Sequence, residues 1–287
     1  MPTRKGEWQP SYTSPAVAGA FPPQQIAEWT DVIHSPPEAY GSPSSRWTLK
    51  SLGQTLKEWR SLSLSGLSRR LKAAGLCYKR GREYVHSPDP QYIAKRDLVQ
   101  WCVAQARSEP ERIVTCYLDE FSFYRQPTVA QDWHATGHTQ PLARRSYRAN
   151  RYHRIIGALN AVTGQVTYRM AARTDVPLIC RFLRSLRLQY SEAERIYVVM
   201  DNWYNVHNHA DVQQTASEEG IELVYLPTYA PWLNPIEKLW RKAYQEVLHL
   251  HRYRDRWSEL TDQMAAFLDQ FSGGSPHLLR YVGLLPA

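Results

Sequence analysis

One short run, RIYVVMDN at residues 195–202, constrains the fold more than any other part of the 287-residue chain. Its apolar residues are nearly continuous up to Met200, and Asp201 and Asn202 follow directly. A strand with one solvent-exposed face alternates apolar and polar residues, whereas a continuous apolar run is typical of a strand buried on both faces. A strand of this kind needs helices on both sides of its sheet, so the run predicts an α/β protein.

The segments around this run can complete such a sheet. Further strands are expected in RIVTCYLDE (112–120), in IELVYL (221–226), and on either side of a turn at 160–165 within RIIGALNAVTGQVTYRMA (154–171). Helices are expected at 176–190, before Gly220, at 235–248, and around 257–271, where the last helix closes the chain. The order predicts a mixed sheet flanked by helices over residues 111–287.

The chain before residue 111 differs in composition and in the spacing of its apolar residues. Residues 1–45 are rich in Pro, Ser and Gly, which predicts a mostly irregular arm in which only FPPQQIAEWTDVIHS can form a short helix. From Trp47 onward leucines recur at helical spacing, in the two sets Leu49, Leu52, Leu56 and Leu64, Leu67, Leu71. Two short helices joined by a tight turn predict a small all-α helix-turn-helix domain at residues 46–86.

The second of these helices carries polar residues suited to a DNA groove, and positive charge continues beyond it. The candidate DNA-contacting residues are Ser65, Ser68, Arg69, Lys72, Lys79, Arg80 and Arg82. The alternative is an ordinary two-helix packing unit with a solvated basic face. A connecting helix is expected within residues 87–110, with Pro90 in its first turn and Ile93, Leu98 and Trp101 along one side.

Charge and cysteine content narrow the class of protein. The formal net charge of +8 favours a polyanionic partner such as nucleic acid, because Lys and Arg release counterions when they neutralise phosphates. The absence of a long apolar run excludes a membrane span, and no secretory signal is evident. Four scattered cysteines predict reduced thiols in a cytoplasmic, nucleoid-associated protein rather than a zinc site or a disulfide framework.

Three acidic residues stand where a catalytic site is expected. Asp119 and Asp201 end two predicted strands, and Glu237 lies in the first turn of the helix that follows Pro235. Carboxylates at strand ends face the crevice where open α/β sheets place their sites. Each acid alone also has an ordinary explanation, as a loop carboxylate or as a favourable charge at a helix N-terminus. Together they predict a site for Mg²⁺ or Mn²⁺, with two ions of the kind used in phosphoryl transfer.

The segments YLDEFSF, VVMDNWYNVHNH and LPTYAPWLNPIEKLW resemble the three signature blocks of mariner-like DDE transposases, most closely the bacterial insertion-sequence (IS six-thirty type) branch. Thirty-five residues separate Asp201 from Glu237, close to the spacing in that superfamily. PPEAYGSPSSRWTL (36–49) is similar to the segment that enters the second helix-turn-helix of the family. The resemblance therefore spans residue 36 to the end.

This resemblance implies a ribonuclease-H-like catalytic domain with Asp119, Asp201 and Glu237 as metal ligands and Asn202 and Asn234 as supporting partners. It implies cut-and-paste transposition by a homodimer on paired terminal inverted repeats, with strand transfer into target DNA at a TA dinucleotide. One departure is that the region before Trp47 is too short for the first of the family's two helix-turn-helix modules.

Neighbouring side chains raise further expectations. Glu120 is expected to point away from the metals, since adjacent residues on a strand face opposite sides. His207 is interpreted as a structural histidine and stays outside the catalytic set.

The basic stretch LARRSYRANRYHR (142–154) predicts DNA contacts by Arg144, Arg145 and Arg148, against the alternative of a solvated face; HLHRYRDR (249–256) has the same two interpretations. Two other functions stay open: an RNase-H-like nuclease without strand transfer, and a non-catalytic DNA-binding protein derived from a transposase.

Overall fold

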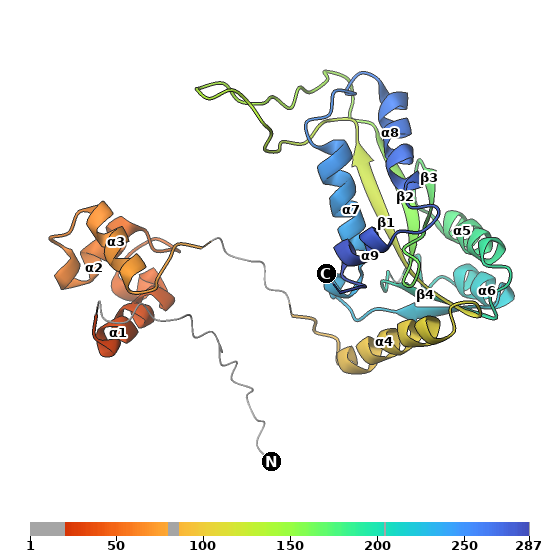
Figure 1. Ribbon diagram of the computed structural model, residues 1–287, viewed down its shortest axis with the longest axis horizontal. Coiled ribbons are helices and arrows are strands. Elements are labelled where there is room, and N and C mark those ends of the chain that lie inside the picture. The colour runs from red at the N-terminus through yellow and green to blue at the C-terminus, as the bar shows by residue number, and fades with distance from the viewer. Residues whose placement is uncertain (1–20, 80–85, 204, 287) are drawn as a thin grey trace, which may run out of the picture. The chain divides into compact units, whose positions relative to one another are not determined.

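The computed structural model describes residues 21–79, 86–203 and 205–286, and these form two compact units (Figure 1). The first unit is Met1–Glu83 and the second is Tyr84–Ala287. Among the described residues, no helix combines the length and the apolar character needed to cross a bilayer.

The second unit is built on a five-stranded sheet of order β3-β2-β1-β4-β5. The β1–β2 and β2–β3 pairs are antiparallel, whereas β1–β4 and β4–β5 are parallel. The strands are β1 Ile113–Tyr124, β2 Tyr152–Asn160, β3 Val166–Ala171, β4 Arg195–Met200 and β5 Ile221–Tyr225. The mixed sheet is confirmed, and β4 is buried from Ile196 to Met200 as its apolar run predicts.

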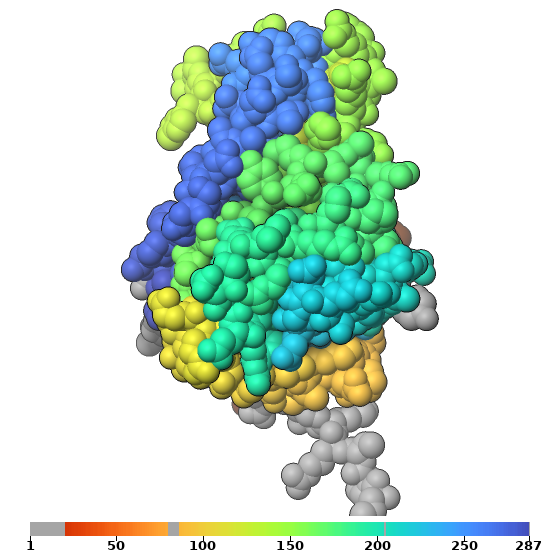
Figure 2. Space-filling model, turned by 90° about the vertical axis from the view of Figure 1, so that its right-hand side faces the viewer, coloured from red at the N-terminus to blue at the C-terminus, as the bar shows by residue number. Residues whose placement is uncertain are grey.

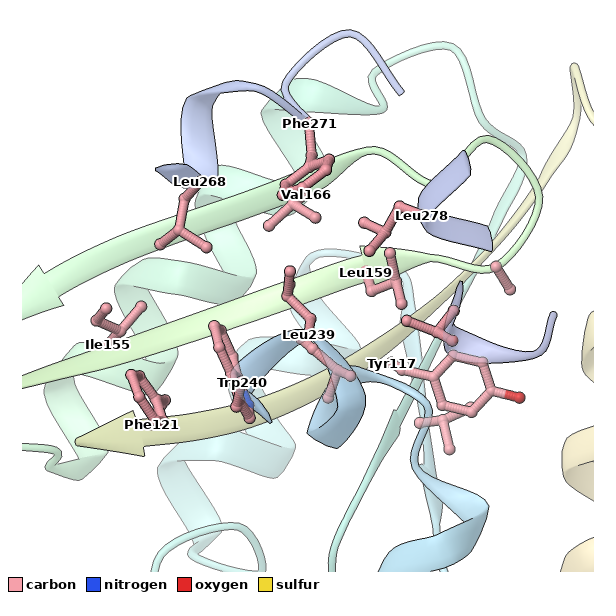
Figure 3. Packing of buried hydrophobic residues seen from close by; sticks show 14 of the residues in the cluster. Tyr117, Phe121, Ile155, Leu159, Val166, Leu239, Trp240, Leu268, Phe271 and Leu278 are labelled. Atoms are coloured by element: carbon pink, nitrogen blue, oxygen red, sulfur yellow. The ribbon is translucent and has the colours of Figure 1, made fainter. Parts of the chain in front are cut away.

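Helices cover both faces of this sheet. On one face lie α5 Val176–Gln189 and α6 Ala210–Glu218, the side turned toward the viewer in Figure 2. The other face packs against α4 Tyr92–Ser108, α7 Ile236–Ala243, α8 Trp257–Asp269 and α9 Pro276–Val282. Figure 3 shows the core on this side, where Phe121 of β1 lies beside Trp240 of α7. The helix α9 was not predicted, because the sequence analysis closed the chain with the helix before it.

The helix α4 is an integral part of the second unit rather than a connector. Val99, Cys102 and Ala106 pack into the core of the sheet, and the Thr115 hydroxyl of β1 donates to the Cys102 carbonyl at 2.9 Å. The predicted apolar side was wrong, because Ile93, Leu98 and Trp101 are 57%, 46% and 46% exposed. The buried side is made by smaller residues, which a search for large apolar side chains overlooked.

The first unit is a small helical bundle that contains the helix-turn-helix candidate. Its elements are α1 Pro23–His34, the 3₁₀ turns Pro37–Tyr40 and Lys57–Trp59, α2 Leu49–Thr55 and α3 Leu64–Ala73. Thr48 caps α2 in a capping box with Ser51, and the Ser63 side chain accepts from the N–H of Gly66 to start α3.

The short helix expected in FPPQQIAEWTDVIHS is confirmed as α1, but the interpretation of residues 1–45 as an irregular arm separate from the helical domain is wrong for the part that the structure describes. Trp29 of α1 is 0% exposed, and its ring packs edge-on against that of Trp59, with centroids 5.2 Å apart. Its indole N–H donates to Glu58 at 3.1 Å. Leu52, Leu67 and the other core residues of α2 and α3 form one cluster with Trp29. The predicted boundary at residue 45 therefore cuts through a hydrophobic core.

All four cysteines are free thiols, in agreement with the prediction. Cys102, Cys116 and Cys180 are buried, and Cys77 is exposed. Burial raises the pKa of the Cys102 and Cys116 thiols to about 11 and about 12, so they stay protonated at neutral pH.

Candidate active site

The site begins where β1 and β4 run parallel. Tyr117 pairs with Val199 in the register of these strands, and Asp119 and Asp201 each follow two residues later. The two carboxylates that were predicted at strand ends therefore start from neighbouring positions at one edge of the sheet. The strand β1 continues past Asp119 to Tyr124, because it also pairs with β2 over this length.

Asp119 is held by a residue of α7, on the face of the sheet that packs against α4, α7, α8 and α9. The indole N–H of Trp240 donates to its Oδ2 at 3.1 Å, and the Trp240 ring stacks on Phe121 with centroids 5.2 Å apart. Gly157 is the β2 partner of Asp119, and a Cβ there would lie 2.7 Å from the Trp240 ring. The absent side chain at Gly157 thus lets the indole reach over β2 to the carboxylate.

Replacing Gly157 with Ala is expected to lower the stability of the second unit by about 1–3 kcal/mol, the usual cost of overpacking a filled core. The Trp240 ring is 3% exposed and stacked, so it cannot move aside freely. Denaturant unfolding measures the loss, with Gly273→Ala as the control, since a Cβ at Gly273 meets nothing within 4 Å. Equal stabilities of the two variants would show that the indole is not fixed against β2.

Asp119 is a buried carboxyl group with other acidic residues nearby. Burial raises its pKa well above the usual value, and the neighbouring charges of Glu237, Glu120 and Asp201 raise it further. A backbone hydrogen bond opposes these effects and acts to lower the pKa of Asp119.

Glu237 comes from the other side of the crevice, in the first turn of α7. Ile236, Leu239 and Trp240 of this helix are buried, which turns Glu237 toward an open groove of about 510 Å³ that Glu120 also lines. Burial raises the pKa of Glu237, Arg241 opposes the shift, and Asp201 adds to it. Glu237 and Asp119 are thus each destabilised as anions by burial and by the other acids.

Asp201 makes its contact with a histidine that the sequence analysis left out. The Nδ1–H of His207 donates to Asp201 Oδ1 at 2.6 Å, and His207 Nε2–H donates to Glu120 Oε1 at 3.0 Å. His207 is 1% exposed, and burial acts to lower its pKa, but the two carboxylates outweigh burial and raise it to about 10. The imidazolium therefore ties the loop after β4 to β1.

This arrangement refines the expectation for Glu120. Asp119 contacts Trp240 of α7, whereas Glu120 contacts His207 in the loop before α6, as alternation along a strand requires. Glu120 is nevertheless joined to the acidic site, because His207 connects it to Asp201. The signal in the sequence was the run NVHNH directly after the strand-end acid.

His207 is expected to make stability depend on pH in the alkaline range. Its folded-state pKa of about 10 lies above the unfolded value of 6.5, so its contribution is complete below about pH 6.5 and is lost as the pH rises through about 10. His207→Gln should remove this slope from a plot of Tm against pH. The exposed His277→Gln is the control; a slope unchanged in His207→Gln would refute the imidazolium bridge.

Asn234 and Asn202, the two expected supporting residues, differ in burial and in their contacts. Asn234 is 4% exposed, its Nδ2 donates to the carbonyl of Leu118 at 3.3 Å, and its Oδ1 is buried without a partner among the described residues. Asn202 is exposed and accepts a hydrogen bond from Asn208. Asn234 thus braces β1 one residue before Asp119, while Asn202 contacts none of the three acids.

The carboxylate oxygens of Asp119, Asp201 and Glu237 suit a divalent cation such as Mg²⁺, although the described side chains do not form a closed cluster. Among residues 21–79, 86–203 and 205–286, no three His, Cys, Asp or Glu side chains stand close enough together to be a metal-ligand group. Glu237 and Asp201 nevertheless raise the pKa of Asp119, Asp201 raises the pKa of Glu237, and the buried amide oxygen of Asn234 has no partner among the described residues. A divalent cation would relieve this repulsion, which is the chemistry that oxygen ligands of this kind support.

The predicted DNA-contacting residues lie in two places. In the first unit, Ser65, Arg69, Lys72 and Lys79 are exposed and Ser68 is half-buried, while Arg80 and Arg82 lie outside the described residues. In the second unit, Arg144, Arg145 and Arg148 are exposed in the long segment between β1 and β2.

Comparison with known proteins agrees with this geometry. The family model described as "DDE superfamily endonuclease" matches residues 114–261, more than half of the chain and the whole of the acidic site. The chain belongs to the DDE superfamily of endonucleases. A relative from Shigella sonnei, the insertion element IS630 uncharacterized 39 kDa protein, is 24% identical over 96% of this chain and 83% of its own length.

Solved structures with the same fold come from the Mos1 mariner transposase. The paired-end complex with the left transposon end has a TM-score of 0.61 at 16% identity, covering 100% of this chain and 79% of that chain. The paired-end complex with Mn has a TM-score of 0.59 at 17% identity over 100% and 79% of the two chains. The ribonuclease-H-like fold class expected of this DDE protein is thereby confirmed.

Proposed function

We propose that this DDE endonuclease is a transposase that performs cut-and-paste transposition of an insertion sequence. The observation that carries the proposal is that Asp119 and Asp201 each lie two residues beyond a paired position of the parallel strands β1 and β4, with Glu237 on α7 close enough to raise the pKa of Asp119. The printed names of its relatives, an insertion element protein and a mariner transposase bound to transposon ends, support the same activity.

The cofactor in this proposal is Mg²⁺ or Mn²⁺, in a pair of ions held by Asp119, Asp201 and Glu237. Such ions supply an activated nucleophile and stabilise the leaving oxygen of an in-line phosphoryl transfer. Mos1 structures with Mn and with Mg support the choice of metal. The chain itself contributes position: Trp240 holds Asp119, His207 holds Asp201, and Asn234 braces β1 at the carbonyl of Leu118.

The substrate in this proposal is double-stranded DNA, bound at the terminal inverted repeats by a homodimer on paired ends and then joined to target DNA. Supporting it are the net charge of +8 and the exposed basic residues of α3. The candidate contacts are Ser65, Ser68, Arg69, Lys72, Lys79, Arg80, Arg82, Arg144, Arg145 and Arg148, and Asn202 and Asn234 are proposed as supporting partners of the metal ligands.

A strand-transfer assay tests the activity. Purified protein is incubated with the DNA that flanks its gene, a supercoiled target plasmid, and Mg²⁺ or Mn²⁺. Joined products that require the metal support transposition. Cleavage without joining would instead assign a nuclease, and binding that is unchanged by metal with no nicking would assign a non-catalytic DNA-binding protein.

A further inference from the structure

A second cavity, of about 720 Å³, lies beyond the far end of β1 and is distinct from the groove beside Glu237. Four arginines line it: Arg125, Arg148, Arg151 and Arg256. They come from segments about a hundred residues apart, one following β1 and leading into β2, the other leading into α8. The yellow-green and blue parts of the chain lie side by side at the top of Figure 2, where these segments meet. We call this cavity the arginine pocket.

Arg125 is the buried member of the arginine pocket. Its side chain is 5% exposed, its Nη1 donates to the Ala149 carbonyl at 3.2 Å, and its Nε is buried with no partner in the part of the chain that the structure describes. Its backbone N–H donates to the Arg151 carbonyl at 2.9 Å, which fixes its place. A guanidinium that is taken out of water with an unused N–H is costly unless an anion pairs with it.

The two acids of the arginine pocket are already engaged. Asp255 accepts from the Ser146 hydroxyl at 2.5 Å and pairs with Arg254 at 3.1 Å. Glu259 pairs with Arg256 at 2.7 Å. By contrast, Arg125, Arg148 and Arg151 form no ion pair within 4.0 Å with any described residue. The charge of Arg148 acts on Asp255 and lowers its pKa, whereas no described acid pairs with the buried Arg125.

The start of α8 adds a third feature to the arginine pocket. This helix has 13 residues, its N-cap is Arg256, and no described side chain caps its first turn. Trp257 and Ser258, the first two helical residues, line the cavity. The first N–H groups of a helix have no partner within it, and together with the helix dipole they favour an anion. Arginine forks and helix N–H groups are both suited to phosphate oxygens.

We propose that the arginine pocket binds a backbone phosphate of the DNA substrate. The inference rests on the proposed function, because it names the part of the chain that holds the duplex away from the cleavage site. Arg125 lies six residues beyond Asp119 along β1, a span of roughly 20 Å at the rise of a strand. This distance corresponds to about six base pairs of duplex. The pocket therefore anchors DNA on the flank of the acidic site.

The test uses Arg148→Ala combined with Arg151→Ala in the full chain. Both side chains are exposed, so the double variant is expected to fold, whereas loss of the buried Arg125 endangers the segment that it supports. Binding of a short fluorescein-labelled duplex of arbitrary sequence is measured by anisotropy over a series of KCl concentrations. The matched control is Arg181→Ala, an exposed arginine on α5, on the opposite face of the sheet.

The double variant is expected to bind the duplex about tenfold more weakly at low salt. The slope of its plot of log K against log [salt] should be smaller in magnitude by about 1–2, because each lost phosphate contact reduces that slope by about 0.9. Arg181→Ala should match the wild type. An unchanged slope and affinity in the double variant would overturn the proposal. A second pair of results would also overturn the proposal. If inorganic phosphate raises the Tm of the wild type while wild type and double variant bind the duplex equally, the pocket takes a free small anion.

The strand-transfer assay keeps this proposal separate from the proposed function. A wild-type protein that shows the predicted difference in salt slope but never joins strands would retain the arginine pocket and reject transposition. If the wild type joins strands but the double variant keeps the wild-type salt slope, transposition is retained and the arginine pocket is rejected.

Discussion

Replacing Asp119 with Asn is expected to abolish strand cleavage and, in the absence of metal, to raise the Tm of the protein. Cleavage fails because Asn is a neutral ligand that cannot offset the charge of a dication. The loss should exceed the roughly 10–100-fold cost of removing a residue that merely supports a ligand. The Tm rises because the buried carboxylate is repelled by Glu237, Glu120 and Asp201.

The pH dependence of this gain has a definite sign. Because burial and the neighbouring acids raise the folded-state pKa of Asp119 above 3.8, the folded protein binds the extra proton and stability falls as the pH rises above that value. The difference in Tm between Asp119→Asn and wild type should therefore be small near pH 4 or below and larger at neutral pH. Differential scanning calorimetry with chelator measures it.

Three further measurements make this prediction specific. Asp262→Asn, on the exposed side of α8, should change neither cleavage nor Tm. Mg²⁺ should raise the Tm of wild type more than that of Asp119→Asn. Glu237→Gln should likewise lose strand joining while DNA binding stays intact. Equal joining by wild type and either active-site variant would remove that residue from the metal site.

The central sheet and the positions of the three acids were predictable because both depend on local patterns. The continuous apolar run before Asp201 is typical of a strand buried on both faces, and parallel neighbours place their carboxyl ends at one edge. Asp119 and Asp201 do follow paired residues of β1 and β4. The positions of the two aspartates could therefore be predicted from the sequence, and their role as metal ligands stays a prediction.

The contacts that hold the acids were not predictable in the same way. The link from Glu120 through His207 to Asp201 joins residues 87 positions apart, and the indole N–H of Trp240 reaches Asp119 across 121 positions. Such contacts depend on which loop folds back over which strand. Composition and periodicity describe a segment by itself and carry no information about its distant partner.

The same limitation explains the error in the first 45 residues. Pro, Ser and Gly around α1 favour an irregular chain, but Trp29 and Val32 are buried against residues of α2 and α3. Packing, not propensity, stabilises a helix of only 12 residues in a small unit. The α1 helix is thus part of the folding unit that presents α3.

Trp29→Ala is accordingly expected to unfold most of the first unit. Truncating a fully buried Trp costs about 3–5 kcal/mol, a large share of the stability available to a unit of this size. Amide hydrogen exchange on the full chain should show α2 and α3 losing protection while β1 to β5 keep theirs. Binding to duplex DNA should weaken in parallel, because α3 carries the proposed DNA contacts Arg69 and Lys72.

The control for this change is Trp133→Ala, since Trp133 is 99% exposed and its loss removes an indole without opening a core. If Trp29→Ala leaves the exchange of α2 and α3 as slow as in wild type, residues 23–34 are a dispensable arm after all. If protection is lost, DNA recognition by this chain requires three helices, and any truncation that removes α1 disables α3 even though it leaves every predicted DNA contact in place.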